Sequence, residues 1–196
     1  MQSFSYLPTL VYREERPDLI DQVSPLCNRK LDEVREYPST VCQSENLRSN
    51  EEMKEISKYL LISAVDILRG QGYSVEQYEF LIESIWAQEI QRGSMTNVHV
   101  HKNSQISGWF FLSGTEDGAY PIYHDTRMNK SMVDLDFARN NEVVAATDAI
   151  HFNNMAPGTV LFSNSWVSHQ LGSGGSVTPM KCLHFVISHK DKSCST

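Results

Sequence analysis

The stretch that decides the fold is Asn97-Val-His-Val-His-Lys-Asn-Ser-Gln-Ile-Ser-Gly-Trp-Phe-Phe-Leu112. It contains two runs rich in β-branched and aromatic residues, 97–102 and 106–112, with a short polar linker between them. Such residues are enriched in strands because their side chains pack well on a pleated surface. We therefore predict two consecutive strands here, joined by a turn.

Six further runs of the same kind lie on both sides of this pair. Turn-forming pairs such as Asp117-Gly118 and Pro157-Gly158 separate them. The additional predicted strands are 78–91, 119–124, 143–152, 159–163, 167–171 and 181–188. Short strands at this spacing are typical of a sandwich or jelly roll rather than of a parallel α/β sheet. The predicted fold class is mainly β.

The chain before Gly72 has a different pattern, with a polar, Pro-containing lead and one clear helix. Ser49 and Glu52 fit a capping box at the start of this helix, and Gly70 and Gly72 fit its end. Its apolar stripe consists of Met53, Ile56, Leu60 and Ile67. We expect this N-terminal helical portion to pack on the β core.

Length and charge limit the function classes. The 196 residues suit a single domain over 1–196, with the lead and helix in about 1–72 and the β core in about 73–190. With 17 basic against 24 acidic residues and no basic cluster, the chain is a poor candidate for a nucleic-acid binder.

The expected location of the protein and the state of its cysteines rest on motifs that the sequence lacks. The N-terminus lacks a basic segment followed by an apolar one, and the longest apolar stretch, 59–68, is too short to span a bilayer. The four cysteines form no C-x-x-C, although a Cys27–Cys42 disulfide is compatible with an oxidising compartment. We expect a cytoplasmic protein without a membrane segment.

Histidines are the residues that could carry chemistry. His99 and His101 lie two apart on a predicted strand, so both imidazoles point to one face with about 7 Å between their backbones. Both could bind one metal ion, and His169 on a neighbouring predicted strand could complete the set. The alternative is that His99 and His101 are half-exposed strand residues and that His169 is a core histidine.

Four further observations come from segments of the chain taken in order. They are Glu83-Ser-Ile-Trp-Ala-Gln-Glu-Ile-Gln-Arg-Gly93, His99-Val-His-Lys-Asn-Ser-Gln-Ile-Ser-Gly-Trp-Phe-Phe-Leu112, Tyr123-His-Asp-Thr-Arg127 and Ala156-Pro-Gly-Thr-Val-Leu-Phe-Ser-Asn-Ser-Trp-Val-Ser-His169. In this order they resemble a family of 2-oxoglutarate/iron(II)-dependent oxygenases found in bacteria and phages. The resemblance runs from about residue 83 to 188, just over half the chain. It implies a double-stranded β-helix, the jelly roll also called cupin-like, with a metal at one mouth.

The resemblance implies that Fe(II) is held by His99, His101 and His169. The wider superfamily has Asp or Glu at the position of His101, so this chain departs from the usual two-histidine, one-carboxylate triad. Asn103 paired with His101 is a weaker alternative because a neutral amide is a poor ligand. Asp125 could supply a carboxylate from an adjacent strand.

The resemblance also implies 2-oxoglutarate as co-substrate, and its far carboxylate needs a cation. The family commonly uses an Arg on the last core strand, where this chain has only Lys181. Lys lacks the two-pronged geometry of Arg, and Lys181 could equally be an exposed strand charge. Arg127 is the second candidate anchor.

The remaining histidines and aromatic residues carry less information. We interpret His151 and His184 as structural and His124 as a candidate hydrogen-bond partner of a ligand. The aromatic residues expected in the core or pocket wall are Trp86, Trp109, Phe110, Phe111 and Trp166.

The leading hypothesis is an Fe(II)- and 2-oxoglutarate-dependent dioxygenase that uses O2 to hydroxylate a substrate. A three-histidine cupin-like metalloenzyme without 2-oxoglutarate is the second, favoured by His101 and by the missing Arg. A non-catalytic, phage-associated jelly-roll module is the third. The sequence does not identify the primary substrate, and a homodimer is the commonest assembly for such a chain.

Overall fold

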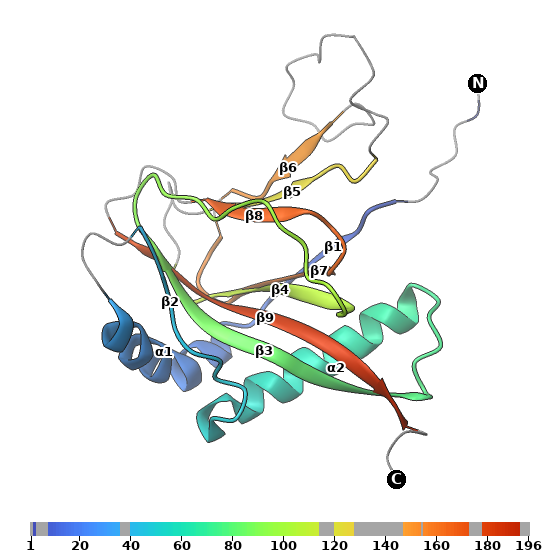
Figure 1. The fold of residues 1–196 in the computed structure, drawn as a ribbon, viewed down its shortest axis with the longest axis horizontal. Helices are drawn as coiled ribbons and strands as arrows, with labels where there is room; N and C mark the ends of the chain where they lie inside the picture. The colour runs from blue at the N-terminus through green and yellow to red at the C-terminus, as the bar shows by residue number, and fades with distance from the viewer. Residues whose placement is uncertain are drawn as a thin grey trace.

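Two antiparallel sheets face each other, and two helices cover the outer face of the larger one (Figure 1). The structure is a computed structural model and describes residues 2, 8–35, 40–113, 120–127, 147–153, 155–172 and 178–192. The arrangement is a jelly roll, as the strand pattern and the resemblance predicted.

The larger sheet has the strand order β1-β7-β4-β9-β3-β2. Its strands are β1 (Val11–Glu15), β2 (Val41–Gln43), β3 (Tyr78–Ile90), β4 (Ile106–Phe111), β7 (Thr159–Asn164) and β9 (Met180–Asp191). The smaller sheet has the order β6-β5-β8, with β5 (Tyr120–His124), β6 (Ala149–His151) and β8 (His169–Gly172).

The central strands of the larger sheet are buried on both faces, and this double burial separates two cores. Phe110 of β4 and Leu183 of β9 pack toward the helices, whereas Trp109 and Cys182 pack between the sheets. Because side chains alternate along a strand, His184 of β9 lies on the same face as Cys182, between the sheets.

Gly108 shows how closely β4 approaches its neighbours. A Cβ built on Gly108 would lie 1.9 Å from the carbonyl oxygen of Leu161 and 2.6 Å from the ring of Phe185. No side chain fits there. Gly108 of the quoted stretch is therefore required by the packing of β4.

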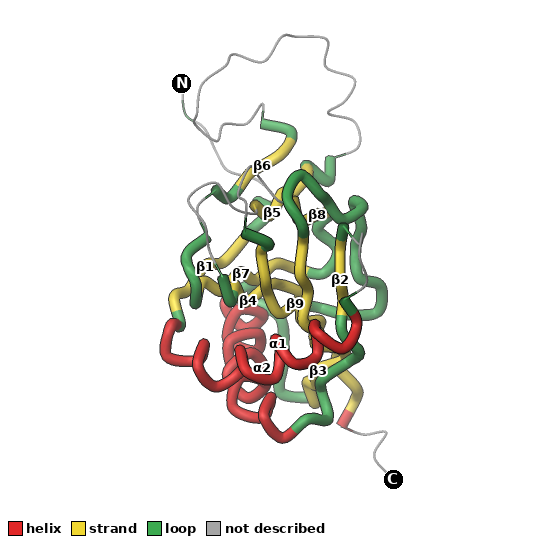
Figure 2. The backbone as a smooth tube through the Cα atoms, turned by 90° about the vertical axis from the view of Figure 1, so that its left-hand side faces the viewer, coloured by secondary structure: helices red, strands yellow, loops and turns green. Residues whose placement is uncertain are grey.

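Helices α1 (Ile20–Val34) and α2 (Lys54–Gly70) lie together on one side of the larger sheet (Figure 2). The strand-based prediction had no helix at 20–34, because Pro25 falls inside it and suggested an irregular lead. The predicted Ser49 cap of α2 is also wrong. Asn50 begins the helical segment, and its side-chain oxygen accepts from the backbone N–H of Glu52 at 2.9 Å.

The segment 97–102 is not the strand that its composition predicted. Its only ladder contact in the described structure is an isolated bridge between His99 and His169. Conversely, β1 and β2 were not predicted, and both join the larger sheet from the lead before residue 72. Of the predicted strand 143–152, the part 143–146 lies outside the described residues.

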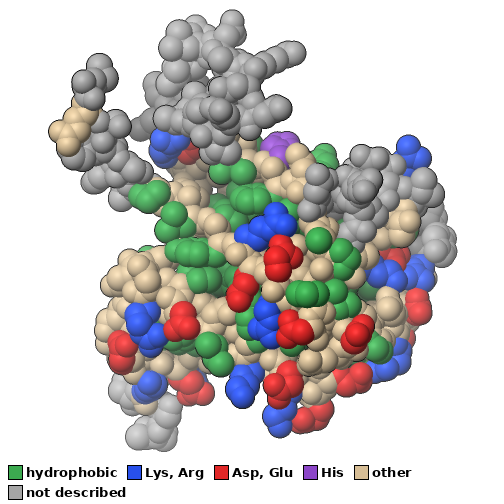
Figure 3. Space-filling model, turned by 180° about the vertical axis from the view of Figure 1, so that it is seen from behind, with side chains coloured by type: hydrophobic (Ala, Val, Ile, Leu, Met, Phe, Trp, Pro, Cys, Tyr) green, Lys and Arg blue, Asp and Glu red, His purple; other side chains and the backbone are tan. Residues whose placement is uncertain are grey.

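The structure also shows the state of three cysteines and whether a described helix could cross a membrane. Cys27, Cys42 and Cys182 are buried free thiols, so the Cys27–Cys42 disulfide is absent. No helix among the described residues is long and apolar enough to cross a membrane. Acidic and basic side chains alternate over the face shown in Figure 3, and its described part has no continuous basic stripe.

Candidate metal centre

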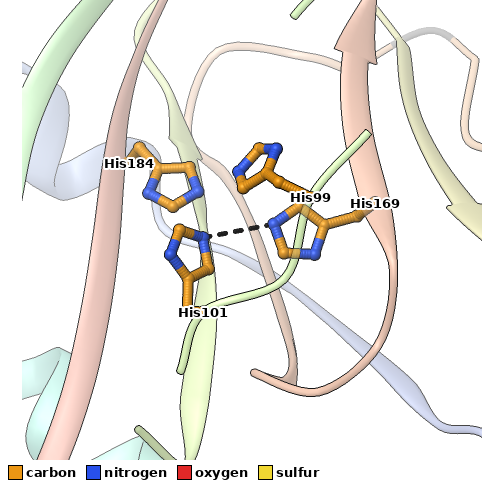
Figure 4. Close-up of side chains that lie close together, drawn as sticks. All are labelled: His99, His101, His169 and His184. Carbon is orange, nitrogen blue, oxygen red and sulfur yellow. Dashed lines mark hydrogen bonds between the residues drawn. The ribbon is translucent and has the colours of Figure 1, made fainter. Parts of the chain in front are cut away.

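Four histidines converge between the two sheets (Figure 4). His99 and His101 come from the segment before β4, His169 begins β8, and His184 lies in the middle of β9. One ring nitrogen from each can be chosen so that all four lie within 4.8 Å of one another. Two nitrogens bound to one ion at about 2.1 Å lie at most about 4.2 Å apart, so a modest contraction would let the set enclose a metal.

Backbone hydrogen bonds bring these segments together. The N–H of His99 donates to the carbonyl of His169 at 2.9 Å, and the N–H of His169 donates back at 3.0 Å. The N–H of His101 donates to the carbonyl of Ser165 at 3.0 Å. The His-x-His segment is therefore fixed beside the start of β8 without being a strand itself.

Two of the rings are oriented by carbonyl groups. Nδ1 of His99 lies 2.8 Å from the carbonyl oxygen of Asn97, and Nδ1 of His169 lies 2.7 Å from that of Val167. A carbonyl oxygen can only accept, so Nδ1 carries the proton in both rings and the lone pair resides on Nε2. Such bonds to the distant nitrogen orient metal-binding histidines.

The Nε2 atoms of His169 and His101 lie 3.3 Å apart, as the dashed line in Figure 4 shows. Adjacent ligands at about 2.1 Å from one ion, at right angles, are about 3.0 Å apart. The observed separation is thus close to that of two nitrogens on one metal.

Burial keeps three of the four imidazoles uncharged. It lowers the pKa of His101 to about 4 and that of His169 to about 3, with smaller contributions from the neighbouring histidines. The pKa of His184 is also far below its ordinary value, again chiefly because of burial. These imidazoles are neutral at pH 7, the form that binds metals.

His184 is the site residue that sequence reasoning missed. It was interpreted as structural because one histidine within an apolar strand usually is. Only the register shows its place, since His184 pairs with Trp86 on one side and Trp109 on the other. The alternation of side chains along β9 could have indicated this place, because it puts His184 on the opposite face from Leu183 and Phe185.

The other proposed ligands are not part of the cluster in the described structure. Asn103 is exposed and has a positive φ of 57°. The carboxylate of Asp125 accepts two bonds from Nε and one from Nη2 of Arg127, at 2.6 to 3.1 Å. His151 is exposed and stacks on Tyr120, while Nε2 of His124 is buried without a partner among the described residues.

The two predicted anchors for the co-substrate also lie elsewhere. Nζ of Lys181 donates to Oδ1 of Asn28 in α1 at 2.6 Å and lies 3.7 Å from the carboxylate of Glu89. Lys181 therefore points to the helix-covered face, opposite to His184. The guanidinium of Arg127 is largely exposed and bound to Asp125. The structure brings neither cation to the histidines.

The space between the sheets offers neutral polar groups instead. The indole N–H groups of Trp86 and Trp109 and the hydroxyls of Ser107 and Ser165 are buried without partners among the described residues. Burial also raises the pKa of Tyr123, which keeps its hydroxyl protonated. No Lys or Arg is among the buried residues that the structure describes. Orphaned donors around a histidine cluster fit a polar ligand bound at a metal.

A jelly roll that gathers four histidines between its sheets has the arrangement of a metal-binding β-barrel protein. A family model described as "Putative 2OG-Fe(II) oxygenase" matches residues 84–185. The chain belongs to this 2-oxoglutarate/iron(II)-dependent oxygenase family, whose metal is Fe(II) and whose co-substrate is 2-oxoglutarate.

Solved structures show the same fold at low sequence identity. The epimerase SnoN from nogalamycin biosynthesis, in complex with Fe3+, alpha ketoglutarate and nogalamycin RO, gives a TM-score of 0.65 at 9% identity, over 92% of this chain and 79% of that chain. A Pseudomonas putida prolyl-4-hydroxylase gives 0.60 at 10% identity, over 93% and 94%. HygX from Streptomyces hygroscopicus, with nickel and 2-oxoglutarate bound, gives 0.54 at 12% identity, over 92% and 83%.

No curated protein matches the chain in sequence.

Proposed function

We propose that His99, His101 and His169 hold an Fe(II) ion and that the protein hydroxylates a substrate with 2-oxoglutarate and O2. The observation that carries the proposal is the convergence of imidazole nitrogens within 4.8 Å between the two sheets. Within this family the bound ion supplies oxidising power from O2 at the expense of the co-substrate.

The chain positions the ligands before any metal arrives. The carbonyls of Asn97 and Val167 orient the rings of His99 and His169, so little ordering remains to be done on binding. Trp109, which is buried, packs edge-on against His169 with 5.1 Å between ring centroids, so this side of His169 is closed to water.

The co-substrate would be bound beside this cluster by neutral groups. The hydroxyl of Ser107 and the indole N–H of Trp109 are buried donors, and donors of this kind can bind carboxylate oxygens. The roles predicted for Lys181 and Arg127 remain predictions. Lys181 would have to leave Asn28 and Glu89 and cross the sheet, and Arg127 would have to leave Asp125.

Anaerobic metal binding is the experiment that tests the proposal. Purified protein is titrated with Fe(II), freed of unbound metal and analysed for iron, and 2-oxoglutarate is then added while the visible spectrum is recorded. We expect one ion per chain and a weak charge-transfer band that needs both iron and co-substrate. His169→Ala should bind iron at least about tenfold more weakly, whereas the exposed His151→Ala should bind as the wild type does. Equal iron binding by the wild type and His169→Ala would contradict the site.

A second candidate function is a metalloenzyme that uses histidine ligands without 2-oxoglutarate. It is favoured by the absence of a carboxylate from the cluster and of a buried Lys or Arg among the described residues. Iron binding without the band, together with turnover that forms no succinate, would select this candidate.

Two wider expectations accompany the proposal. The three buried free thiols support a reducing compartment such as the cytoplasm. A homodimer stays a prediction, and light scattering of the purified protein tests it. The primary substrate would enter at the mouth of the jelly roll where the histidines gather.

A further inference from the structure

We propose that His184 is a fourth protein ligand, so that the ion is held by four neutral imidazoles. This inference rests on the proposed metal site and deepens it. It departs from the two-histidine, one-carboxylate set that is usual for non-haem iron oxygenases.

His184 adjoins the trio of His99, His101 and His169 on the side of His101. Its ring centroid lies 4.8 Å from that of His101 and 6.2 to 6.3 Å from those of His169 and His99, and its ligating nitrogen lies within 4.8 Å of a nitrogen of each of the other three. His184 enters the cluster from β9 of the larger sheet, whereas His169 enters it from β8 of the smaller sheet (Figure 4). An ion among the trio is therefore also within reach of His184.

The orientation of His184 is set by two tryptophans. Its ring stacks on Trp86 with 4.6 Å between centroids and 19° between planes, and it meets Trp109 edge-on at 5.3 Å. This slot holds the ring without using either nitrogen. Both nitrogens of His184 are buried and have no hydrogen-bond partner among the described residues. A buried polar atom without a partner is costly, and a bound cation would satisfy one of them.

Among the residues that the structure describes, no carboxylate competes for this position. Glu89, the buried acidic residue nearest to it along the β3–β9 pair, accepts from Arg35 at 2.7 Å on the helix-covered face. Asp125 is bound by Arg127. The ion would thus keep its full double charge, and imidazole-rich sites of this kind suit several divalent metals.

The experiment counts imidazoles on the metal. The wild type and His184→Gln are loaded with Co(II), and proton NMR spectra in H2O and D2O identify the strongly shifted, exchangeable N–H signals of bound histidines. We expect four such signals in the wild type and three in His184→Gln. His151→Gln, a change at an exposed histidine that stacks on Tyr120, should keep all four. Competition with a chelator should also show at least about tenfold weaker Co(II) binding by His184→Gln.

Each outcome decides the proposal. Equal numbers of signals in the wild type and His184→Gln would overturn the fourth ligand and leave the three-histidine site intact. Failure of the wild type to bind Co(II) or Fe(II) would overturn both. If His184→Gln does not fold, four signals in the wild type support the proposal and three overturn it.

Discussion

At the scale of single residues, the buried histidines make the free energy of unfolding depend on pH. His101 and His169 are buried as neutral rings, with pKa values near 4 and 3, whereas in the unfolded chain each titrates near its ordinary value of 6.5. Between pH 6.5 and 4 the unfolded chain therefore binds more protons than the folded one, and stability rises with pH.

We accordingly predict that the metal-free protein loses stability as the pH falls from 7 to 5. Each histidine that stays neutral in the fold contributes a slope of up to about 1.4 kcal/mol per pH unit below its unfolded pKa. Urea unfolding in the presence of a chelator at pH 7, 6 and 5 measures this slope. His169→Gln should have a shallower slope than the wild type, and an identical slope in the two proteins would contradict the assignment.

The site could be predicted at this scale only as far as its residues show a local pattern. His99 and His101 are two apart, and His169 follows a motif, so the sequence placed all three. His184 has no such neighbour, and the pairing of β9 with both β3 and β4 is what carries it into the cluster. Lys181 was predicted to belong to the site and does not lie there. The sequence shows its charge, but it does not show that Lys181 binds Asn28 of α1 on the other face of the sheet.

At the scale of elements, composition predicted strands well where both faces of a strand are buried. The predicted and observed limits of β3, β4 and β9 agree within a few residues. The segment 97–102 has the composition of a strand, yet it makes only one isolated bridge, between His99 and His169. Helix α1 was missed for a different reason. Burial of Val23, Leu26 and Leu31 against the larger sheet outweighs the cost of Pro25.

The start of α2 provides a direct test of a local assignment. The side chain of Asn50, not that of Ser49, accepts from the backbone N–H of Glu52. We predict that Asn50→Ala lowers the free energy of unfolding by about 1 kcal/mol. Ser49→Ala is the matched control and should change it by less than about 0.5 kcal/mol. Thermal or urea unfolding of both variants decides the matter, and a larger loss in Ser49→Ala would restore the capping box expected from the sequence.

At the scale of the whole molecule, the helices and the jelly roll share one core. Leu26 of α1 and Leu60 of α2 belong to the same buried cluster as Ile85, Leu183 and Phe185 of the larger sheet. In addition, β1 and β2 supply the two edge strands of that sheet. The boundary near residue 72 in the sequence is thus a change of composition, while the packing continues across it.

We therefore predict that residues 73–196 alone do not fold cooperatively. Removing 1–72 would expose Ile85, Phe110, Leu183 and Phe185 to water, at roughly 1.5–3 kcal/mol for each side chain, which together approaches the whole stability of a typical domain, about 5–15 kcal/mol. It would also uncover the edges of β7 and β3, which now pair with β1 and β2. Urea unfolding followed by circular dichroism, with dye binding as a measure of exposed apolar surface, compares the fragment with the full chain. A sharp transition in the fragment, without dye binding, would show that the jelly roll is an independent domain and that the helices are an addition to it.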